Sequence, residues 1–115
     1  ELVDAQFKAD PHAQVIVLGD FNAVDNSELL RIITGEKRFS DTQLINLSER
    51  IEKERRYSFA GYREKRQLDH ILISKSLVNC VEEFQLLNEG LEDQTLFPEQ
   101  IYFESDHAPL ILTLK

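Results

Sequence analysis

The chain has 115 residues, of which 42% are hydrophobic and 30% charged, and its net charge is −8. A chain of this length buries roughly two-thirds of its unfolded surface, so it can form a core, and it is too apolar for a disordered segment. Its apolar runs are shorter than the ~20 residues of a membrane-spanning helix. One cysteine, Cys80, excludes internal disulfides and a cysteine-based zinc cage. The net charge argues against a generic polyanion-binding surface.

The first residues, ELVDAQFKAD, have the pattern of an amphipathic helix, because Val3 and Phe7 are four apart and share one face. The chain contains no methionine, and its start has no signal or transit pattern. We therefore expect it to be the interior or C-terminal part of a longer protein.

The segment 15–21, VIVLGDF, opens with an apolar, β-branched run that predicts a strand covered on both faces. Helix-capping residues follow at 25–27, SELLRIIT is helical, and Gly35 is a natural helix stop. Residues 42–50 predict a short helix or turn.

The later segments predict mainly strands. RYSFAGY and QLDHILIS have strand character and are joined by a polar hairpin connection at 63–66. In the second, alternation places Leu68, His70 and Leu72 on one face and Asp69, Ile71 and Ile73 on the other. Residues 80–87 and 108–115 predict two further strands, separated by a long acidic loop at 88–104. Strands outnumber helices, which favours an α/β layered fold with a mixed or antiparallel sheet.

Basic side chains are concentrated in one stretch. Residues 50–66 hold seven of the thirteen lysines and arginines, namely Arg50, Lys53, Arg55, Arg56, Arg63, Lys65 and Arg66. Such a patch can steer an anion to one place in an acidic protein. It is equally what a solvated helix end and hairpin of mixed charge would carry.

Three polar clusters lie at the ends of apolar strands: Gly19-Asp20-Phe21-Asn22, Leu68-Asp69-His70 and Ser105-Asp106-His107. Alone, each is also typical of a turn, a helix cap or a strand start. Neighbouring strands bring their ends together, so the clusters can converge. Carboxylates, an amide and a carboxylate-held histidine at one sheet edge suit phosphate chemistry, because they can bind Mg²⁺, orient water and contact phosphoryl oxygens.

Read in order, GDFN, LDHILIS and SDHAP resemble the C-terminal half of the endonuclease/exonuclease/phosphatase (deoxyribonuclease I-like) family. The likeness runs from about Val15 to the end of the chain. YSFAGY followed by LDHILIS most resembles bacterial nuclease-like members, which are often secreted. The family fold is a four-layer α/β sandwich. The resemblance implies that residues 1–115 are the C-terminal portion of one such domain, with a mixed, mostly antiparallel sheet and flanking helices.

The resemblance also implies roles for individual residues. Asp20 would position or activate the attacking water, or protonate the leaving oxygen, and would share a Mg²⁺ ion (or Mn²⁺ or Ca²⁺) with Asp106. Asn22 would hold the phosphate, and His107, oriented by Asp69, would stabilise charge or act as a base. Supporting positions would be His70, where many family members carry Tyr, and Ser105. Weaker candidates for contacting substrate are Arg63, Lys65 and Arg66.

The family supplies a metal-binding Glu and further polar residues from its N-terminal half, which this sequence does not contain. The chain alone should therefore bind Mg²⁺ poorly and be nearly inactive, and one face of its sheet should be exposed, apolar and prone to self-association. The expected activity of the longer protein is metal-dependent hydrolysis of phosphodiesters, with a nucleic acid as substrate.

Two alternatives stay open: a phosphomonoesterase or lipid phosphodiesterase of the same superfamily, and a binding module without catalysis. The inositol phosphatases typically carry Cys-Asp-Arg where this chain has Leu-Asp-His, which disfavours them.

Overall fold

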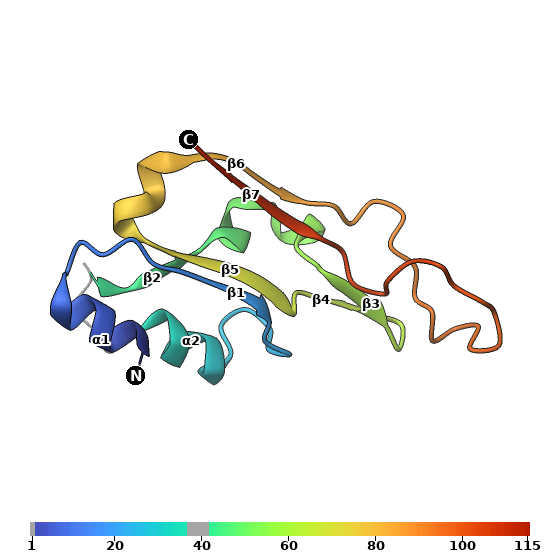
Figure 1. Ribbon diagram of the computed structural model, residues 1–115. Helices are drawn as coiled ribbons and strands as arrows, with labels where there is room; N and C mark the ends of the chain where they lie inside the picture. Colours follow the sequence, from blue (N-terminus) through green and yellow to red (C-terminus); the bar gives the residue numbers. More distant parts are fainter. Residues whose placement is uncertain (1, 37–41) are drawn as a thin grey trace.

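A computed structural model describes residues 2–36 and 42–115, with principal extents of 51 × 30 × 23 Å. The described part is a mixed α/β structure (Figure 1). Its elements, in chain order, are α1 (Leu2–Ala9), β1 (Ile16–Asp20), α2 (Glu28–Thr34), β2 (Leu44–Asn46), η2 (Leu47–Arg50), η3 (Lys53–Arg55), β3 (Phe59–Gly61), β4 (Glu64–Arg66), β5 (Asp69–Ser74), η4 (Lys75–Cys80), β6 (Val81–Leu86) and β7 (Leu110–Leu114). None of the helices in this part of the chain is both long and apolar enough to cross a membrane.

The two α-helices lie where the sequence predicts them. In α2, the hydroxyl oxygen of Ser27 accepts a hydrogen bond from the backbone N–H of Leu30, which caps the first turn. Gly35 ends α2 in the left-handed region at φ 83°, where a residue without a Cβ is not strained. Phe7 of α1 is buried, as its helical spacing indicates.

Antiparallel pairing joins the strands into three small sheets, in place of the single sheet expected. The first has the order β1-β5-β2, the second pairs β3 with β4, and the third pairs β6 with β7. Every strand pair among the described residues is antiparallel, which is one of the two arrangements expected, a mixed or an antiparallel sheet.

The central strand β5 has a core on each face. On one face, Leu72 packs with Phe7 of α1 and Leu30 of α2. On the other face, Ile71 and Ile73 pack with η2 and η4, and with residues of β6 and β7. Figure 1 shows the result as layers, with the two helices on one side of the first sheet and the β6–β7 pair on the other. Leu72 and Ile73 are both fully buried, and each such side chain contributes about 1.5–3 kcal/mol.

Strand β1 differs from the expectation that both its faces are covered. It is an edge strand, and its residues alternate between exposed and half-buried. Ile16 is 40% exposed and Leu18 is 66% exposed. These two residues line an apolar groove of about 410 Å³ together with Leu110, Leu112 and Leu114 of β7. Apolar side chains of β1 and β7 are therefore exposed in the described structure, although β5 is covered on both faces.

Two local predictions differ from the structure. The short helix or turn predicted for residues 42–50 is confirmed at η2 (Leu47–Arg50), whereas residues 44–46 form β2, because they pair with β5 and bury Leu44. Residues 63–66 are not a connection between the two predicted strands. Instead, β3 pairs with β4 through a turn at Tyr62 and Arg63, and β5 begins a separate sheet.

The β3–β4 turn is held by the 88–109 loop, which connects β6 to β7. Tyr62 and Arg63 have φ values of 53° and 63°, a left-handed conformation that side chains disfavour. The Tyr62 N–H donates to the Thr95 hydroxyl at 2.7 Å, and the Arg63 N–H donates to the Asp93 carboxylate at 2.7 Å. These bonds compensate the strain and place the loop beside the hairpin.

Candidate functional site

Strand register brings together the first two of the three polar clusters. In the antiparallel pair of β1 and β5, Asp20 lies opposite Asp69. The Phe21 N–H donates to the Leu68 carbonyl at 3.0 Å, so the pairing continues one residue beyond β1. Two carboxylates from segments 49 positions apart in the sequence thus lie at one end of the sheet.

The third cluster, Ser105-Asp106-His107, is held in place by contacts with the β3–β4 hairpin and the residue before it. His107 forms an isolated antiparallel bridge with Phe59, and the Ala108 N–H donates to the Ser58 carbonyl at 2.7 Å. The rings of Phe59 and His107 lie 5.1 Å apart. The hydroxyl oxygen of Ser105 accepts from the His107 N–H at 3.0 Å. Ser105 therefore shapes the turn before His107.

A short hydrogen bond links the second and third clusters. His107 Nδ1 lies 2.7 Å from Asp69 Oδ2, and both side chains are mostly buried. Partial burial, the largest single influence, lowers the pKa of His107. The hydrogen bond and charge of Asp69, with the charges of Asp20 and Asp106, outweigh it and raise that pKa above its ordinary value of 6.5. The geometry therefore favours the charged imidazolium.

The Asp20–Asn22 segment forms a tight turn at the end of β1. The Asn22 N–H donates to Asp20 Oδ1 at 2.8 Å, and Asn22 has a φ of 49°, which asparagine tolerates better than most residues. This bond orients the Asp20 carboxylate. Among the described residues, its second oxygen has no hydrogen-bond partner and remains available.

The carboxylates and the histidine also meet the spacing of a metal site. One ligand atom from each of Asp20, Asp69 and His107 lies within 4.8 Å of the others. However, Asp69 and His107 already bond to each other. Asp106, the other metal ligand predicted from the sequence, is not part of this cluster, although its charge acts on His107. Two carboxylates suit Mg²⁺, which proteins usually hold with one or two carboxylates plus waters and substrate phosphate.

The three basic residues predicted to contact substrate lie in different surroundings. The Arg66 guanidinium lies 5.3 Å from the centre of the Phe59 ring, the same ring that His107 packs against. Lys65 instead lies over Tyr57, 4.6 Å from its ring centre. Arg63 is in the β3–β4 turn. The structure thus places only Arg66 of the three against a residue that touches His107.

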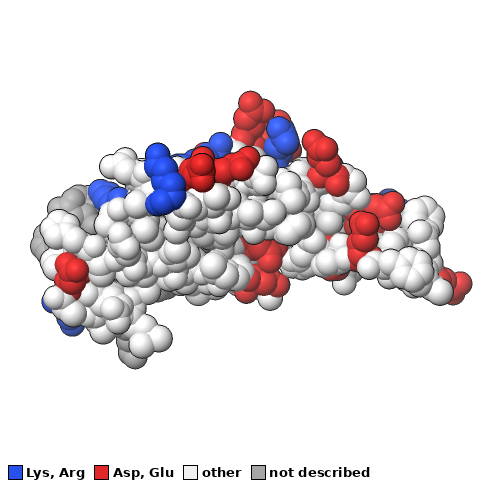
Figure 2. All heavy atoms as spheres, turned by 45° about the horizontal axis from the view of Figure 1, so that its top comes forward, with Lys and Arg blue, Asp and Glu red and all other residues white. Residues whose placement is uncertain are grey.

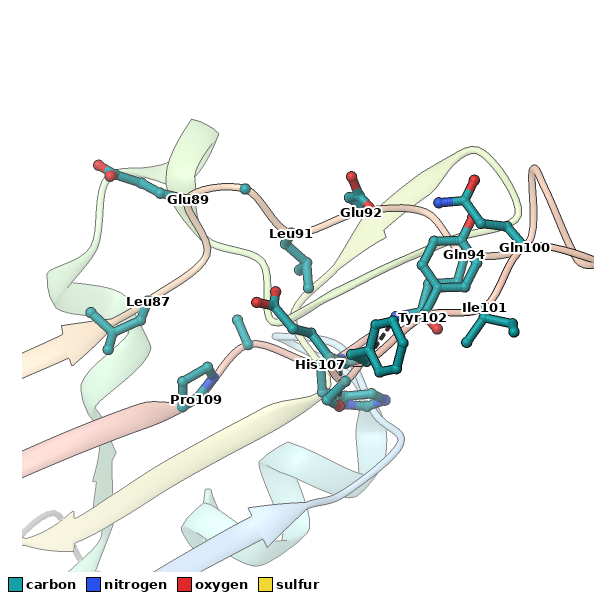
Figure 3. Close-up of a pocket in the computed structure, with 15 residues that line it drawn as sticks. Leu87, Glu89, Leu91, Glu92, Gln94, Gln100, Ile101, Tyr102, His107 and Pro109 are labelled. Atoms are coloured by element: carbon teal, nitrogen blue, oxygen red, sulfur yellow. Dashed lines mark hydrogen bonds between the residues drawn. The ribbon is translucent and has the colours of Figure 1, made fainter.

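Two cavities border the site. The groove between β1 and β7 has Asp20 and Asp69 at its rim. A larger, open pocket of about 680 Å³ is lined by residues between positions 87 and 109, His107 among them (Figure 3). Glu92, Gln94, Tyr102 and His107 are among the lining residues labelled in Figure 3. The catalytic candidates therefore lie between an apolar groove and a loop-lined cavity.

Sequence reasoning missed Ser58 as a site residue. Ser58 is fully buried, and its hydroxyl oxygen accepts from the backbone N–H groups of Leu68 at 3.0 Å and Asp69 at 2.9 Å. It thereby fixes the start of β5, and with it the Asp69 carboxylate. The sequence feature that could have indicated Ser58 is the presence of a serine within the apolar YSFAGY segment.

Comparison of the chain with known proteins gives no match to a family model, a curated protein or a solved structure.

Proposed function

We propose that this chain is the C-terminal portion of an endonuclease/exonuclease/phosphatase domain that hydrolyses phosphodiesters, with nucleic acid as the substrate. The observation that carries the proposal is the Asp69–His107 hydrogen bond of 2.7 Å, formed next to Asp20 by residues from three segments of the chain. A carboxylate-held histidine beside a second carboxylate is a set of groups suited to phosphate chemistry. The same segments carry the family resemblance.

Each residue of the site has its own proposed role, and the raised pKa of His107 favours a role for its charged form. His107, held by Asp69, is suited to neutralise charge that develops on the phosphoryl oxygens. Asp69 holds the ring in place. Asp20, with one carboxylate oxygen free, orients the attacking water and accepts its proton as the bond from phosphorus to the leaving oxygen breaks. The Asn22 amide donates to a phosphoryl oxygen without adding charge.

Mg²⁺ is the proposed cofactor, with Mn²⁺ and Ca²⁺ as substitutes, and Asp20 and Asp106 would hold it. When bound, it would neutralise phosphate charge and polarise the reacting oxygens. Two carboxylates make a weak site, so a Glu from an upstream half would complete it, as the resemblance implies. We accordingly propose that the 115-residue chain alone is nearly inactive. We also propose that its exposed groove between β1 and β7 makes it self-associate.

The test uses the natural full-length protein with Mg²⁺. Plasmid DNA, bis-p-nitrophenyl phosphate and an inositol phosphate are offered in parallel, with and without EDTA. We expect DNA and the diester to be cleaved, and Asp20→Ala and His107→Ala to abolish cleavage. Glu82→Gln, which removes an exposed carboxylate on β6, is the matched control. Cleavage unaffected by either site variant would reject the site, and cleavage of the monoester alone would reject the phosphodiesterase.

A second candidate is a lipid phosphodiesterase, and the 88–109 loop favours it. The loop has six acidic residues and no lysine or arginine. Its exposed side chains include Phe97 at 64%, Ile101 at 77% and Phe103 at 97%. On the face in Figure 2, the charged side chains at the end where this loop lies are mostly acidic. An acidic, apolar loop lining the cavity at His107 suits an amphipathic substrate better than a polyanion.

Phosphatidylcholine vesicles separate the two candidates. The nuclease predicts DNA cleavage with intact vesicles, whereas the lipid phosphodiesterase predicts release of the headgroup. In the second case, Phe103→Ser should reduce hydrolysis of the vesicles but not of bis-p-nitrophenyl phosphate.

A further inference from the structure

The proposed reaction gives no direct role to the most deeply buried histidine. His70 is 1% exposed and lies in β5, next to Asp69 in sequence. Its Nε2 is 2.7 Å from the carbonyl oxygen of Ala23, and its Nδ1 is 3.1 Å from Nδ2 of Asn46. Both ring nitrogens therefore have partners in the protein interior.

The hydrogen-bond network determines which nitrogen carries the proton. The Ser48 N–H can only donate, and it lies 3.1 Å from Asn46 Oδ1, so that atom is the amide oxygen. The Asn46 NH₂ group then faces His70 and donates to Nδ1. Because Nδ1 accepts, Nε2 carries the hydrogen and donates it to the Ala23 carbonyl. The geometry fits a neutral imidazole protonated on Nε2.

Ala23 directly follows Asn22, so this bond holds the loop that carries two proposed site residues. Asn22 is in the left-handed region, and its N–H fixes the Asp20 carboxylate. Strain of this kind persists where surrounding contacts over-determine the backbone. The His70 bond is such a contact, and the ring of Phe21, which is in the same loop as Asn22, lies 5.8 Å from the ring of His70.

The other end of the loop, at Asp25, is hydrogen-bonded to the same network. Asn46 Nδ2 also lies 3.3 Å from Asp25 Oδ1, and Asp25 Oδ2 accepts from Arg56 at 3.4 Å. Asp25 Oδ1 is the only carboxylate oxygen found near His70 in the described residues, at 3.6 Å from Nδ1. Asn46 thus links His70 to Asp25, and the segment between Asp20 and Asp25 is held at both ends.

We propose that His70 is a positioning residue, whose Nε2–H clamps the Ala23 carbonyl and so fixes Asn22 and Asp20 toward the scissile phosphate. The clamp itself is independent of the reaction, whereas its effect on turnover rests on the function proposed above. A displacement of about 1 Å in a catalytic group can cost on the order of 100-fold in rate.

The test compares His70→Gln with His70→Asn in the full-length protein. Glutamine places an amide N–H near the position of Nε2 and can still reach Ala23, whereas asparagine reaches only the position of Nδ1. We expect His70→Asn to lower kcat for bis-p-nitrophenyl phosphate by about 10- to 100-fold, with KM changed less than about 3-fold. His70→Gln should recover kcat to within about 5-fold. Equal loss in both variants, or a loss in KM alone, would overturn the clamp.

A second measurement does not depend on activity, so it tests the clamp even if one of the variants fails to fold. Two-bond ¹H–¹⁵N correlation spectra of the imidazoles, assigned by loss of the His70 signals in His70→Gln or by sequential assignment, report the tautomer. The clamp requires the Nε2–H form. An Nδ1–H form, or an imidazolium exchanging with solvent, would refute it. If the wild-type protein cleaves no phosphoester but His70 is the Nε2–H form, the proposed function fails and the clamp stands.

Discussion

Asp69→Asn tests the pair on which the proposed function depends. The variant keeps the size of the side chain but removes the charge that holds His107 Nδ1 at 2.7 Å. An asparagine can present its NH₂ to Nδ1 and so select the wrong tautomer. Two of the influences that raise the pKa of His107, the hydrogen bond to Asp69 and its charge, are lost together.

The expected size of the effect follows from the partial burial of the pair. The side chains of His107 and Asp69 are 28% and 20% exposed, so their bond is shielded from water but not desolvated completely. A hydrogen bond to a charged group contributes about 1.5–3 kcal/mol. Since each ~1.4 kcal/mol is a factor of ten in rate, kcat should fall by about 10- to 150-fold. The pKa of His107 should also fall from its raised position.

The assay is hydrolysis of bis-p-nitrophenyl phosphate by the full-length protein as a function of pH, with Glu82→Gln as the charge-matched control. NMR titration of the His107 ring without metal gives the pKa independently of turnover. The reasoning is refuted if Asp69→Asn leaves the pKa of His107 where it is in the wild type. It is also refuted if kcat falls no further than in the control.

Three further predictions concern stability and association. Leu72→Ala empties a fully buried site in β5 and should cost about 2–5 kcal/mol of unfolding free energy in urea, whereas a cost below ~1 kcal/mol would contradict the assigned core. Because folding raises the pKa of His107, its ion pair should stabilise the metal-free protein fully below pH 6.5, and this contribution should be lost as pH rises through the raised pKa. His107→Gln should therefore destabilise more at pH 6 than at pH 8.5 in EDTA, and His12→Gln, an exposed control, should show no such trend. Leu18→Lys should shift the 115-residue chain toward monomer in sedimentation, whereas Leu2→Lys, on the exposed part of α1, should not.

Short-range patterns predicted most of the elements correctly. Ser27 and Gly35 delimit α2 because capping bonds depend on neighbouring residues. The alternation in QLDHILIS predicted the two faces of β5, where Leu72 and Ile73 belong to different core clusters. Residues 44–46 were missed because a three-residue strand has little periodicity and is stabilised by its pairing with β5.

The sequence by itself determined which residue types are available for chemistry, and in which order they occur. GDFN places polar groups at the end of an apolar strand, and LDH and SDH place them at or before the start of one, which is a local property of the chain. Only the tertiary structure decided that Asp20 lies opposite Asp69, that Asp69 bonds to His107, and that the His70 ring reaches the Ala23 carbonyl. Strand register and hairpin placement depend on long-range packing and hydrogen bonds, which a local pattern does not encode.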